Sequence, residues 1–215
     1  MSKQVASETG WRGSREGWLE AAYDALIEGG IDAVKIMPLA NRLKLSRTSF
    51  YWFFNDRDEL LTALADYWST RTTMPLIAAA RAYADTETEA MLNLLACFLK
   101  PGEFDDRLEF AVRSWALQDD AIMQRLQAAD IERLETIGQL LMKWGHSEQD
   151  ADVRARTIYL VQIGYISMQV REDAATRLTR IPGYVEIYTG KLPHSRELAR
   201  FRANIGYDDG GSADN

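Results

Sequence analysis

The sequence contains little of what metal-dependent, redox and hydrolytic chemistry requires. Only two histidines occur in the 215 residues: His146 beside a glycine turn and His194 after a proline. Neither has the spacing to cysteine, histidine or carboxylate residues that characterises a metal site or a catalytic triad. The sequence also has no glycine-rich phosphate loop and no nucleophile elbow. We therefore expect no enzyme activity, no metal ion and no cofactor, and we expect both histidines to lie in exposed loops.

Disulfides and long hydrophobic runs are missing as well. Cys97 is the single cysteine, and its leucine and phenylalanine neighbours favour a buried, inert thiol over a redox sensor. The longest apolar stretches, residues 94–99 and 158–163, are much shorter than the ~20 residues that a membrane span requires. The sequence does not open with the pattern of a signal peptide. We expect a cytoplasmic protein with no membrane partner.

Basic residues are outnumbered overall but gather in one window. The net charge is −7, which argues against a nucleic-acid partner because phosphate binding needs a basic face. Residues 33–57, however, contain five basic residues and one acidic residue, a local charge of +4. On charge alone, this window fits an ordinary solvated helix face better than a DNA contact. The basic residues are Lys35, Arg42, Lys44, Arg47 and Arg57.

Hydrophobic residues recur three and four positions apart along most of the chain, as in amphipathic helices. Near the N-terminus this spacing predicts helices over residues 15–28, 36–43 and 47–53. The signals that bound them are caps at Ser14 and Ser46, the Gly29-Gly30 stop, and Pro38 in a first turn.

The same periodicity continues through the rest of the chain. Asp56 and Glu59 resemble a capping box and predict a fourth helix, which we expect to end near Met74 and Pro75. Ser147 follows a glycine turn and predicts a long helix over residues 148–170. The last helical region, residues 172–189, contains Pro182, and the sequence leaves open whether it kinks or splits there. The predicted fold class is all-α.

Residues 35–54 have the form of a helix-turn-helix motif, with a tight turn at Lys44 and Leu45. The second helix of such a motif lays its N-terminal residues in the major groove of DNA. Arg47 can reach a guanine edge or a phosphate there, and Thr48 and Ser49 are small enough for close approach. Short helix pairs of this kind also occur in many helical proteins that do not bind DNA.

An aromatic run follows directly, and its commoner role is core packing. Helical spacing places Phe50, Phe53 and Phe54 on the inward side, with Tyr51 nearer the outer side beside Arg47 and Thr48. The spacing does not place Trp52.

The sequence SRTSFYWFFNDRDELL at residues 46–61 resembles the signature of the TetR family: a capped recognition helix, an aromatic run ending in Phe, and a capped fourth helix. The resemblance covers about residues 12–72. It implies that Tyr51 and Arg57 contact phosphates and that Phe54 packs behind the recognition helix. The chain departs from many members at Lys35, where they have Thr, and at Phe53, where they have a His or Tyr that can donate a hydrogen bond.

This resemblance implies a helix-turn-helix DNA-binding domain at residues 12–72 and a larger helical effector-binding and dimerisation domain at residues 73–207. The polar residues 208–215 predict a disordered tail. The implied function is a sequence-specific, homodimeric transcriptional repressor that a small-molecule effector releases from a two-fold operator. The predicted DNA-binding residues are Lys35, Lys44, Ser46, Arg47, Thr48, Ser49, Tyr51, Trp52 and Arg57.

The second domain offers candidates for an effector cavity, which should be apolar with a few polar groups. Core packing is the commoner role for each of them. Arg113 lies among apolar residues, so it needs either a carboxylate ligand or an internal Asp or Glu. The candidates are Phe98, Phe110, Arg113, Trp115, Trp144, Tyr165 and Met168.

Residues 158–170 are apolar on nearly every side, so the core of one protomer cannot be their only neighbour. A two-fold homodimer is the commonest way to cover such a helix. By resemblance, this helix and residues 172–189 form a four-helix bundle with the partner's copies. The predicted interface residues are Ile158, Val161, Ile163, Ile166, Val170 and Leu178.

The alternative function is a helical dimeric protein-binding module, or a small-molecule-binding protein that does not bind DNA. It explains the apolar helix, but neither the basic window nor the signature at residues 46–61. The sequence does not decide whether an effector relieves or strengthens DNA binding.

Overall fold

A computed structural model describes residues 13–207, and within that range every regular element is helical. The predicted tail and residue 12 of the predicted first domain lie outside the described residues. The N-terminal elements are α1 (Arg15–Gly29), the 3-10 turn η2 (Ile31–Ala33), α2 (Ile36–Leu43), α3 (Arg47–Phe50) and α4 (Arg57–Arg71). The remaining helices are α5 (Thr73–Arg81), α6 (Glu87–Leu99), α7 (Asp106–Ala116), α8 (Asp120–Lys143), α9 (Glu148–Ser167), α10 (Ala174–Thr189) and α11 (Ser195–Asn204). The predicted all-α fold class is confirmed.

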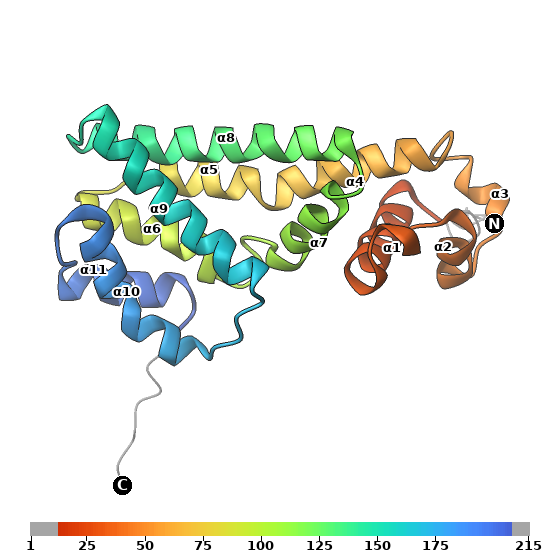
Figure 1. The fold of residues 1–215 in the computed structure, drawn as a ribbon. Coiled ribbons are helices and arrows are strands. Elements are labelled where there is room, and N and C mark those ends of the chain that lie inside the picture. Colours follow the sequence, from red (N-terminus) through yellow and green to blue (C-terminus); the bar gives the residue numbers. More distant parts are fainter. Residues whose placement is uncertain (1–12, 208–215) are drawn as a thin grey trace, which may run out of the picture.

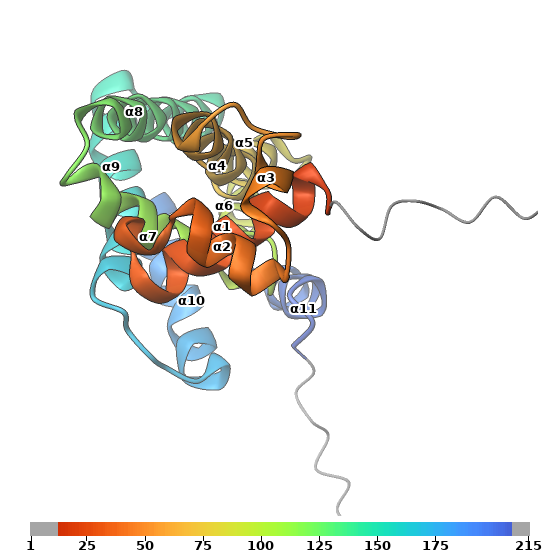
Figure 2. The ribbon, with the colours of Figure 1, turned by 90° about the vertical axis from the view of Figure 1, so that its right-hand side faces the viewer.

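The helices form two groups, which α4 and α7 join (Figure 1). At one end α1, α2 and α3 pack together, and Figure 2 looks onto this end. In the larger group α8 packs along α5 and α9, while α6 lies between α5, α10 and α11. Because α7 contacts α1 and α4 as well as α8 and α9, it is the bridge between the groups.

The caps that bound the N-terminal helices are those predicted. The Ser14 hydroxyl accepts a hydrogen bond from the Gly17 N–H at 3.0 Å, and α1 ends at Gly30, whose φ of 71° favours glycine. At α4 the Asp56 carboxylate accepts from the Glu59 N–H at 2.9 Å. The Glu59 carboxylate accepts from the N–H of Asn55, one residue before the cap, so the reciprocal bond of a capping box is shifted by one position.

The predicted end of α4 near Met74 and Pro75 is wrong. The break falls earlier, at Thr72, and Pro75 is the third residue of α5. A proline in the first turn of a helix removes an N–H that has no intrahelical partner, so it begins a helix as readily as it ends one. In the sequence, Pro75 is interpreted as the end of a helix, and α5 is therefore not predicted.

The C-terminal helices differ from the prediction in three places. Helix α9 ends at Ser167 rather than at residue 170, and α10 begins at Ala174 rather than at residue 172. Helix α10 continues through Pro182, which lacks only the N–H that would bond to the carbonyl of Leu178. Helix α11 was not predicted, because only two of its residues are buried, Glu197 and Phe201.

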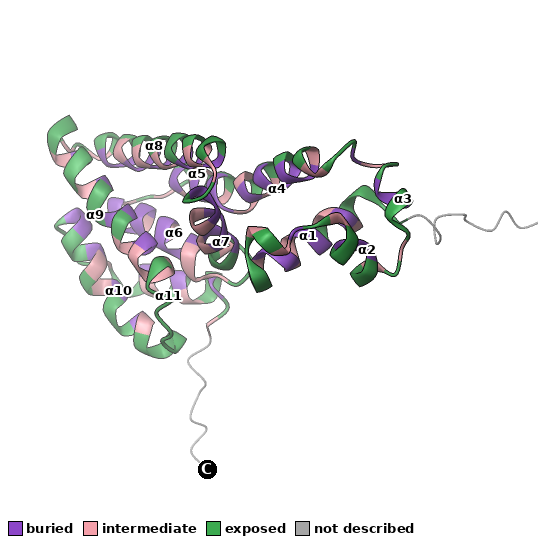
Figure 3. Cartoon of the chain, turned by 45° about the vertical axis from the view of Figure 1, so that its right-hand side comes forward, coloured by how far each residue is buried: buried purple, intermediate pink, exposed green. Residues whose placement is uncertain are grey.

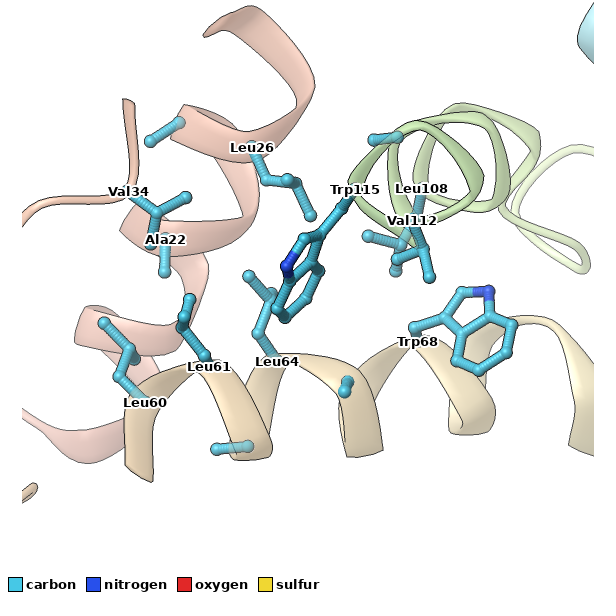
Figure 4. Packing of buried hydrophobic residues seen from close by; sticks show 14 of the residues in the cluster. Ala22, Leu26, Val34, Leu60, Leu61, Leu64, Trp68, Leu108, Val112 and Trp115 are labelled. Atoms are coloured by element: carbon cyan, nitrogen blue, oxygen red, sulfur yellow. The ribbon is translucent and has the colours of Figure 1, made fainter. Parts of the chain in front are cut away.

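A hydrophobic core, the first core, fixes the N-terminal helices on α7 (Figure 4). It joins Trp18 and Leu26 of α1, Leu64 of α4, and Val112 and Trp115 of α7, all of them buried. Burial of a large apolar side chain stabilises a fold by ~1.5–3 kcal/mol. The first core therefore spans the predicted boundary between residues 72 and 73, and the division into two domains stays a prediction.

A second core holds the larger group together and includes Leu94, Ile137, Ile158 and Val185, which come from four helices. Cys97 is buried in it, as predicted, and burial raises the pKa of its thiol to about 12. Among the described residues no helix is long and apolar enough to cross a membrane.

Candidate DNA-binding surface and ligand cavities

The turn between α2 and α3 is built by local backbone geometry. Lys44 adopts a left-handed conformation with φ of 55°, and the Leu45 N–H donates to the carbonyl of Ala40 at 2.9 Å. The Ser46 hydroxyl then accepts from the Ser49 N–H at 3.3 Å and starts α3. This arrangement is the predicted helix-turn-helix, although α3 ends at Phe50 and residues 51–53 form a turn.

The aromatic run divides between core and surface as predicted. The Phe50 ring meets the Trp18 ring edge-on at 5.2 Å between centroids and stacks on the Phe54 ring at 5.4 Å. Phe53 is half-buried, while Tyr51 is 46% exposed and Trp52 is 65% exposed. Trp52, which helical spacing did not place, therefore lies on the outer side.

Most of the predicted DNA-binding residues are exposed, and Figure 3 marks exposed positions on α2 and α3. The Arg47 guanidinium donates to the Tyr51 hydroxyl at 3.1 Å and lies 5.9 Å from the centre of its ring. These contacts hold the Arg47 and Tyr51 side chains next to each other on the surface of α3. The exposed predicted residues are Lys35, Lys44, Ser46, Arg47, Thr48, Tyr51 and Trp52.

Two predicted DNA-binding residues have contacts within the motif. Ser49 is buried, and its hydroxyl donates to the Ser46 carbonyl at 2.7 Å. The Arg57 guanidinium donates to the carbonyls of Val34 at 2.7 Å and Ile31 at 3.1 Å. Arg57 therefore ties the start of α4 to the segment before α2, and its phosphate contact stays a prediction.

The basic window is less uniform than its sequence suggests. Arg42 forms a two-pronged contact with Glu28 of α1, at 2.7 and 2.8 Å, and a third contact with Asp24 at 3.3 Å. Its charge is therefore offset by α1. Of the other basic residues in the window, Lys35, Lys44 and Arg47 are exposed and Arg57 is half-buried.

Sequence reasoning missed a buried polar network centred on Arg133 of α8, which we call the Arg133 network. The Arg133 guanidinium pairs with Glu109 of α7 at 2.8 Å, and neither side chain has any exposed surface. It also donates to the hydroxyls of Thr72 and Thr73 at the α4–α5 junction. The Trp68 indole of α4 donates to Glu109 at 2.7 Å. No sequence pattern marked this network, because its members come from positions far apart in the chain.

The positive and negative charges in this network stabilise each other's ionised forms. Burial opposes ionisation of Glu109, but the guanidinium groups of Arg133 and Arg113 keep the pKa of Glu109 below its ordinary range. Arg113 is paired with Glu109 at 2.9 Å and with Asp130 at 2.5 Å. Of the two partners that the sequence left open for Arg113, the structure contains the internal carboxylates.

Two adjoining cavities lie beside α7 and α9. The groove, about 380 Å³, is lined by Ile27 of α1, by residues of α7 and by the C-terminal end of α9. The recess, about 40 Å³, is lined by Phe98, Phe104, Gln162 and Arg177 among others. The groove and the recess share four lining residues, Asp106, Tyr165, Ile166 and Val170.

Only some of the predicted effector residues meet at these cavities. Phe110 and Tyr165 line the groove, and Phe98 and Tyr165 line the recess. Arg113 lines a separate groove between α7 and α8. Among residues 13–207, Trp115, Trp144 and Met168 line none of these three cavities. Trp115 lies in the first core, Trp144 packs against the second core, and Met168 is exposed on the surface.

The predicted dimer-interface residues are distributed between the core and the surface. Ile158, Ile163 and Leu178 are buried in the second core, Val161 and Ile166 are half-buried, and Val170 is exposed. The exposed apolar residues on α9 and α10 are instead Val153, Leu160 and Ile187. Val153 and Leu160 are seven residues apart and share one face of α9.

The prediction that both histidines lie in exposed loops is wrong for His146. Its ring lies between the carboxylates of Asp150 at 2.6 Å and Glu87 at 2.5 Å. His194 is exposed, as predicted, at the start of α11. Among residues 13–207, no three or more histidine, cysteine, aspartate or glutamate side chains are arranged so that they could hold a metal ion.

Comparison with known proteins identifies the N-terminal helices. The family model of bacterial regulatory proteins, tetR family, matches residues 19–64, which run from α1 into α4. The resemblance predicted from residues 46–61 is therefore confirmed. A comparison with curated proteins finds no match.

Solved structures of transcriptional regulators share the fold over most of the chain. The fatty acid degradation regulator FadR from Bacillus halodurans is 16% identical with a TM-score of 0.62, covering 84% of this chain and 96% of that one. AmtR from Mycobacterium smegmatis is 14% identical with a TM-score of 0.59, covering 96% and 98%. A TerR/AcrR-family regulator from Aquifex aeolicus VF5 is 16% identical with a TM-score of 0.58, covering 83% and 96%. At these identities the likeness shows a common fold.

Proposed function

Because its N-terminal helices belong to the tetR family of bacterial regulatory proteins, we propose that this chain is a sequence-specific DNA-binding transcriptional regulator acting as a homodimer in the cytoplasm. The observation that carries the proposal is the surface around α3, where Arg47, Thr48, Tyr51 and Trp52 are exposed together above a buried aromatic layer. An exposed tyrosine and tryptophan beside basic residues fit a nucleic-acid contact better than an isolated solvated helix.

Each exposed side chain has a role in the proposal. Arg47 reads a guanine edge in the major groove or binds a phosphate, and Thr48 lets α3 approach the bases. Tyr51, Lys35 and Lys44 contact phosphates on either side, which supplies affinity and fixes the register without reading sequence.

Dimerisation positions two such surfaces on one operator. A dimer on a two-fold site presents its recognition helices about one DNA turn apart, roughly 34–36 Å. We place the interface on the exposed faces of α9 and α10, around Val153, Leu160 and Ile187, because exposed apolar side chains of this size gather there. Ile158, Ile163 and Leu178 then support the interface from inside the protomer.

The groove gives this regulator a route from ligand to DNA. Ile27 belongs to α1, which packs against α2, while Ile166 belongs to α9, on the opposite wall. A small molecule in the groove touches both helix groups and changes their spacing, and with it the separation of the two recognition helices. We propose that the ligand-bound spacing disfavours the operator, so that the protein is a repressor released by its effector. Couplings of this kind are typically about 5- to 150-fold.

Selection of bound DNA from a random pool tests the proposal. We expect the full chain to enrich a two-fold sequence whose half-sites lie about 10 bp apart, centre to centre. A pool that shows no enrichment after repeated rounds at low salt would reject the DNA-binding function and favour the protein-binding alternative.

A further inference from the structure

Arg177 lines the recess and differs from most partly buried arginines because it has no carboxylate partner among the described residues. It lies in the first turn of α10 and lines the recess, half-buried, with its guanidinium 4.6 Å from the centre of the Tyr165 ring. Its guanidinium donates one long hydrogen bond, 3.4 Å from Nη2 to the Oε1 of the buried Gln162. No carboxylate among residues 13–207 comes within 4.0 Å of it. Burial lowers the pKa of Arg177, because the charge is poorly compensated.

Four other arginines of the larger helix group have carboxylate partners. Arg133 and Arg113 each pair with Glu109, and Arg180, three residues beyond Arg177 on α10, pairs with Glu172 at 2.6 Å. Arg154 pairs with Asp150 and donates to two carbonyls of α10. A partly buried cation normally has such a partner, because an unpaired buried charge is strongly disfavoured. Arg177 therefore has room for an anionic partner.

The wall of the groove is positive, although the protein is acidic overall. Arg107 and Arg171 line the groove, Arg177 lines the recess, and Asp106, which is exposed, lines both cavities. The two arginines of the groove outnumber its single aspartate and favour an anion over a cationic ligand, and Arg177 is the basic side chain of the recess. The remaining walls are largely aromatic and aliphatic, with Phe98 and Phe104 in the recess and Phe110 and Ile166 in the groove.

The two cavities differ in size. The recess, about 40 Å³, exceeds the roughly 10–15 Å³ that one water molecule needs, so it can hold a small polar group. The groove of about 380 Å³ lies within the range of small-molecule pockets, roughly 300–1,000 Å³, and takes the rest of the ligand.

We infer that the groove and recess bind an apolar monocarboxylic acid, with its carboxylate on Arg177 in the recess and its hydrocarbon part between Phe110, Ile166 and Ile27 in the groove. The inference names the effector class and so rests on the proposed function. Arginine suits the role because its planar guanidinium binds a carboxylate through two parallel hydrogen bonds. The hydrocarbon part links α1 to α9 when it fills the groove.

Calorimetric titration of the full chain tests the site without DNA. The probes are decanoate and 4-phenylbutyrate, each compared with the neutral amide of the same skeleton. We expect wild type to bind at least one acid about tenfold or more tightly than its amide, since a hydrogen bond to a charged group contributes ~1.5–3 kcal/mol. Arg177→Gln should remove this preference. Arg180→Gln, on the same helix and outside the recess, is the matched control and should keep it.

The outcomes separate the site from the regulator. The site is rejected if neither acid binds wild type saturably, if acid and amide bind equally, or if Arg177→Gln keeps the preference. Should Arg177→Gln fail to fold by circular dichroism, Arg177→Lys replaces it and is expected to weaken the preference, because lysine cannot form the two parallel bonds. Operator titration is done separately. An acid that binds through Arg177 without changing operator affinity supports the site and rejects the coupling. If neither acid binds a chain that still binds its operator, the site is rejected and the DNA-binding function stands.

Discussion

Arg133 and Glu109 form an ion pair at 2.8 Å in which neither side chain has exposed surface, and this pair ties α8 and α7 to the end of α4. Trp68 of α4 and Thr72, which directly follows α4, both bond to it, so the helix that carries the DNA-binding group is anchored by a charge pair as well as by the first core. Hydrogen bonds from buried charges are directional, whereas apolar packing tolerates small shifts. The pair therefore fixes the angle at which α4 leaves the larger helix group.

Removing one member of this pair should destabilise the protein strongly. Glu109→Gln leaves Arg133 buried without its counter-charge, and we expect a loss of about 3–5 kcal/mol in the free energy of unfolding. Urea denaturation at one fixed protein concentration measures it. Asp66→Ala is the control, because it breaks the exposed Asp66–Arg125 pair, which should contribute no more than ~1 kcal/mol. Equal losses in the two variants would contradict the role given to the Arg133 network.

Arg57 should affect stability as well as DNA binding. Arg57→Ala removes the hydrogen bonds to the carbonyls of Val34 and Ile31, so we expect a loss of about 1–2 kcal/mol of stability together with weaker DNA binding. Arg47→Ala, whose guanidinium contacts only the exposed Tyr51, should weaken DNA binding and leave the unfolding midpoint unchanged. Thermal unfolding and DNA titration of both variants give the two readouts. An Arg57→Ala protein as stable as wild type would show that the carbonyl contacts contribute nothing.

His146 should make stability fall as pH rises. Burial opposes its charge, but the hydrogen bonds to Asp150 and Glu87 outweigh burial and raise the pKa of His146 in the folded protein. A raised folded pKa means that the stabilisation is fully present below the unfolded pKa of about 6.5 and is lost as pH rises through the folded pKa. We expect the difference in unfolding free energy between wild type and His146→Asn to be largest below about pH 6.5 and to shrink as the pH rises above it. A difference that stays constant or grows as the pH rises would contradict the assignment.

The dimer interface is best tested at Leu160. Ile163 is buried in the second core, so Ile163→Glu would disrupt the protomer and report nothing on association. Leu160 is 59% exposed on α9, and Leu160→Glu should leave a folded protein that sediments as a monomer. Leu117→Glu, on an exposed leucine at the end of α7, should still form dimers. A Leu160→Glu protein that remains dimeric would place the interface elsewhere.

What the sequence predicted correctly depends on neighbours along the chain. The caps at Ser14, Ser46 and Asp56 and the burial of Phe50 and Phe54 follow from residues within four positions of one another. What it missed depends on distant partners. The Arg133–Glu109 pair joins residues 24 positions apart, and Glu87 reaches His146 from 59 positions away.

The candidate cavity follows the same rule. Tyr165, Phe98 and Phe110 were predicted because apolar cavities need aromatic side chains, but the unpaired cation is Arg177 and not Arg113. The sequence around an arginine in the first turn of a helix does not show whether that arginine will have a carboxylate partner in the folded protein. Only the packing of α10 against α9 separates them.

The most direct test of the central claim is the salt dependence of DNA binding. The selected operator is titrated with wild type, Arg47→Ala, Tyr51→Ala and the control Arg200→Ala, whose side chain lies on α11 and pairs with Glu89. In a plot of log affinity against log salt concentration, wild type should have a steep negative slope, and each lost phosphate contact should reduce its magnitude by roughly one unit. We predict weaker binding for Arg47→Ala and Tyr51→Ala, with a slope shallower by about one unit wherever the lost contact is to a phosphate, and wild-type values for Arg200→Ala. Wild-type affinity and slope in all three variants would contradict the assignment of the α3 surface to DNA.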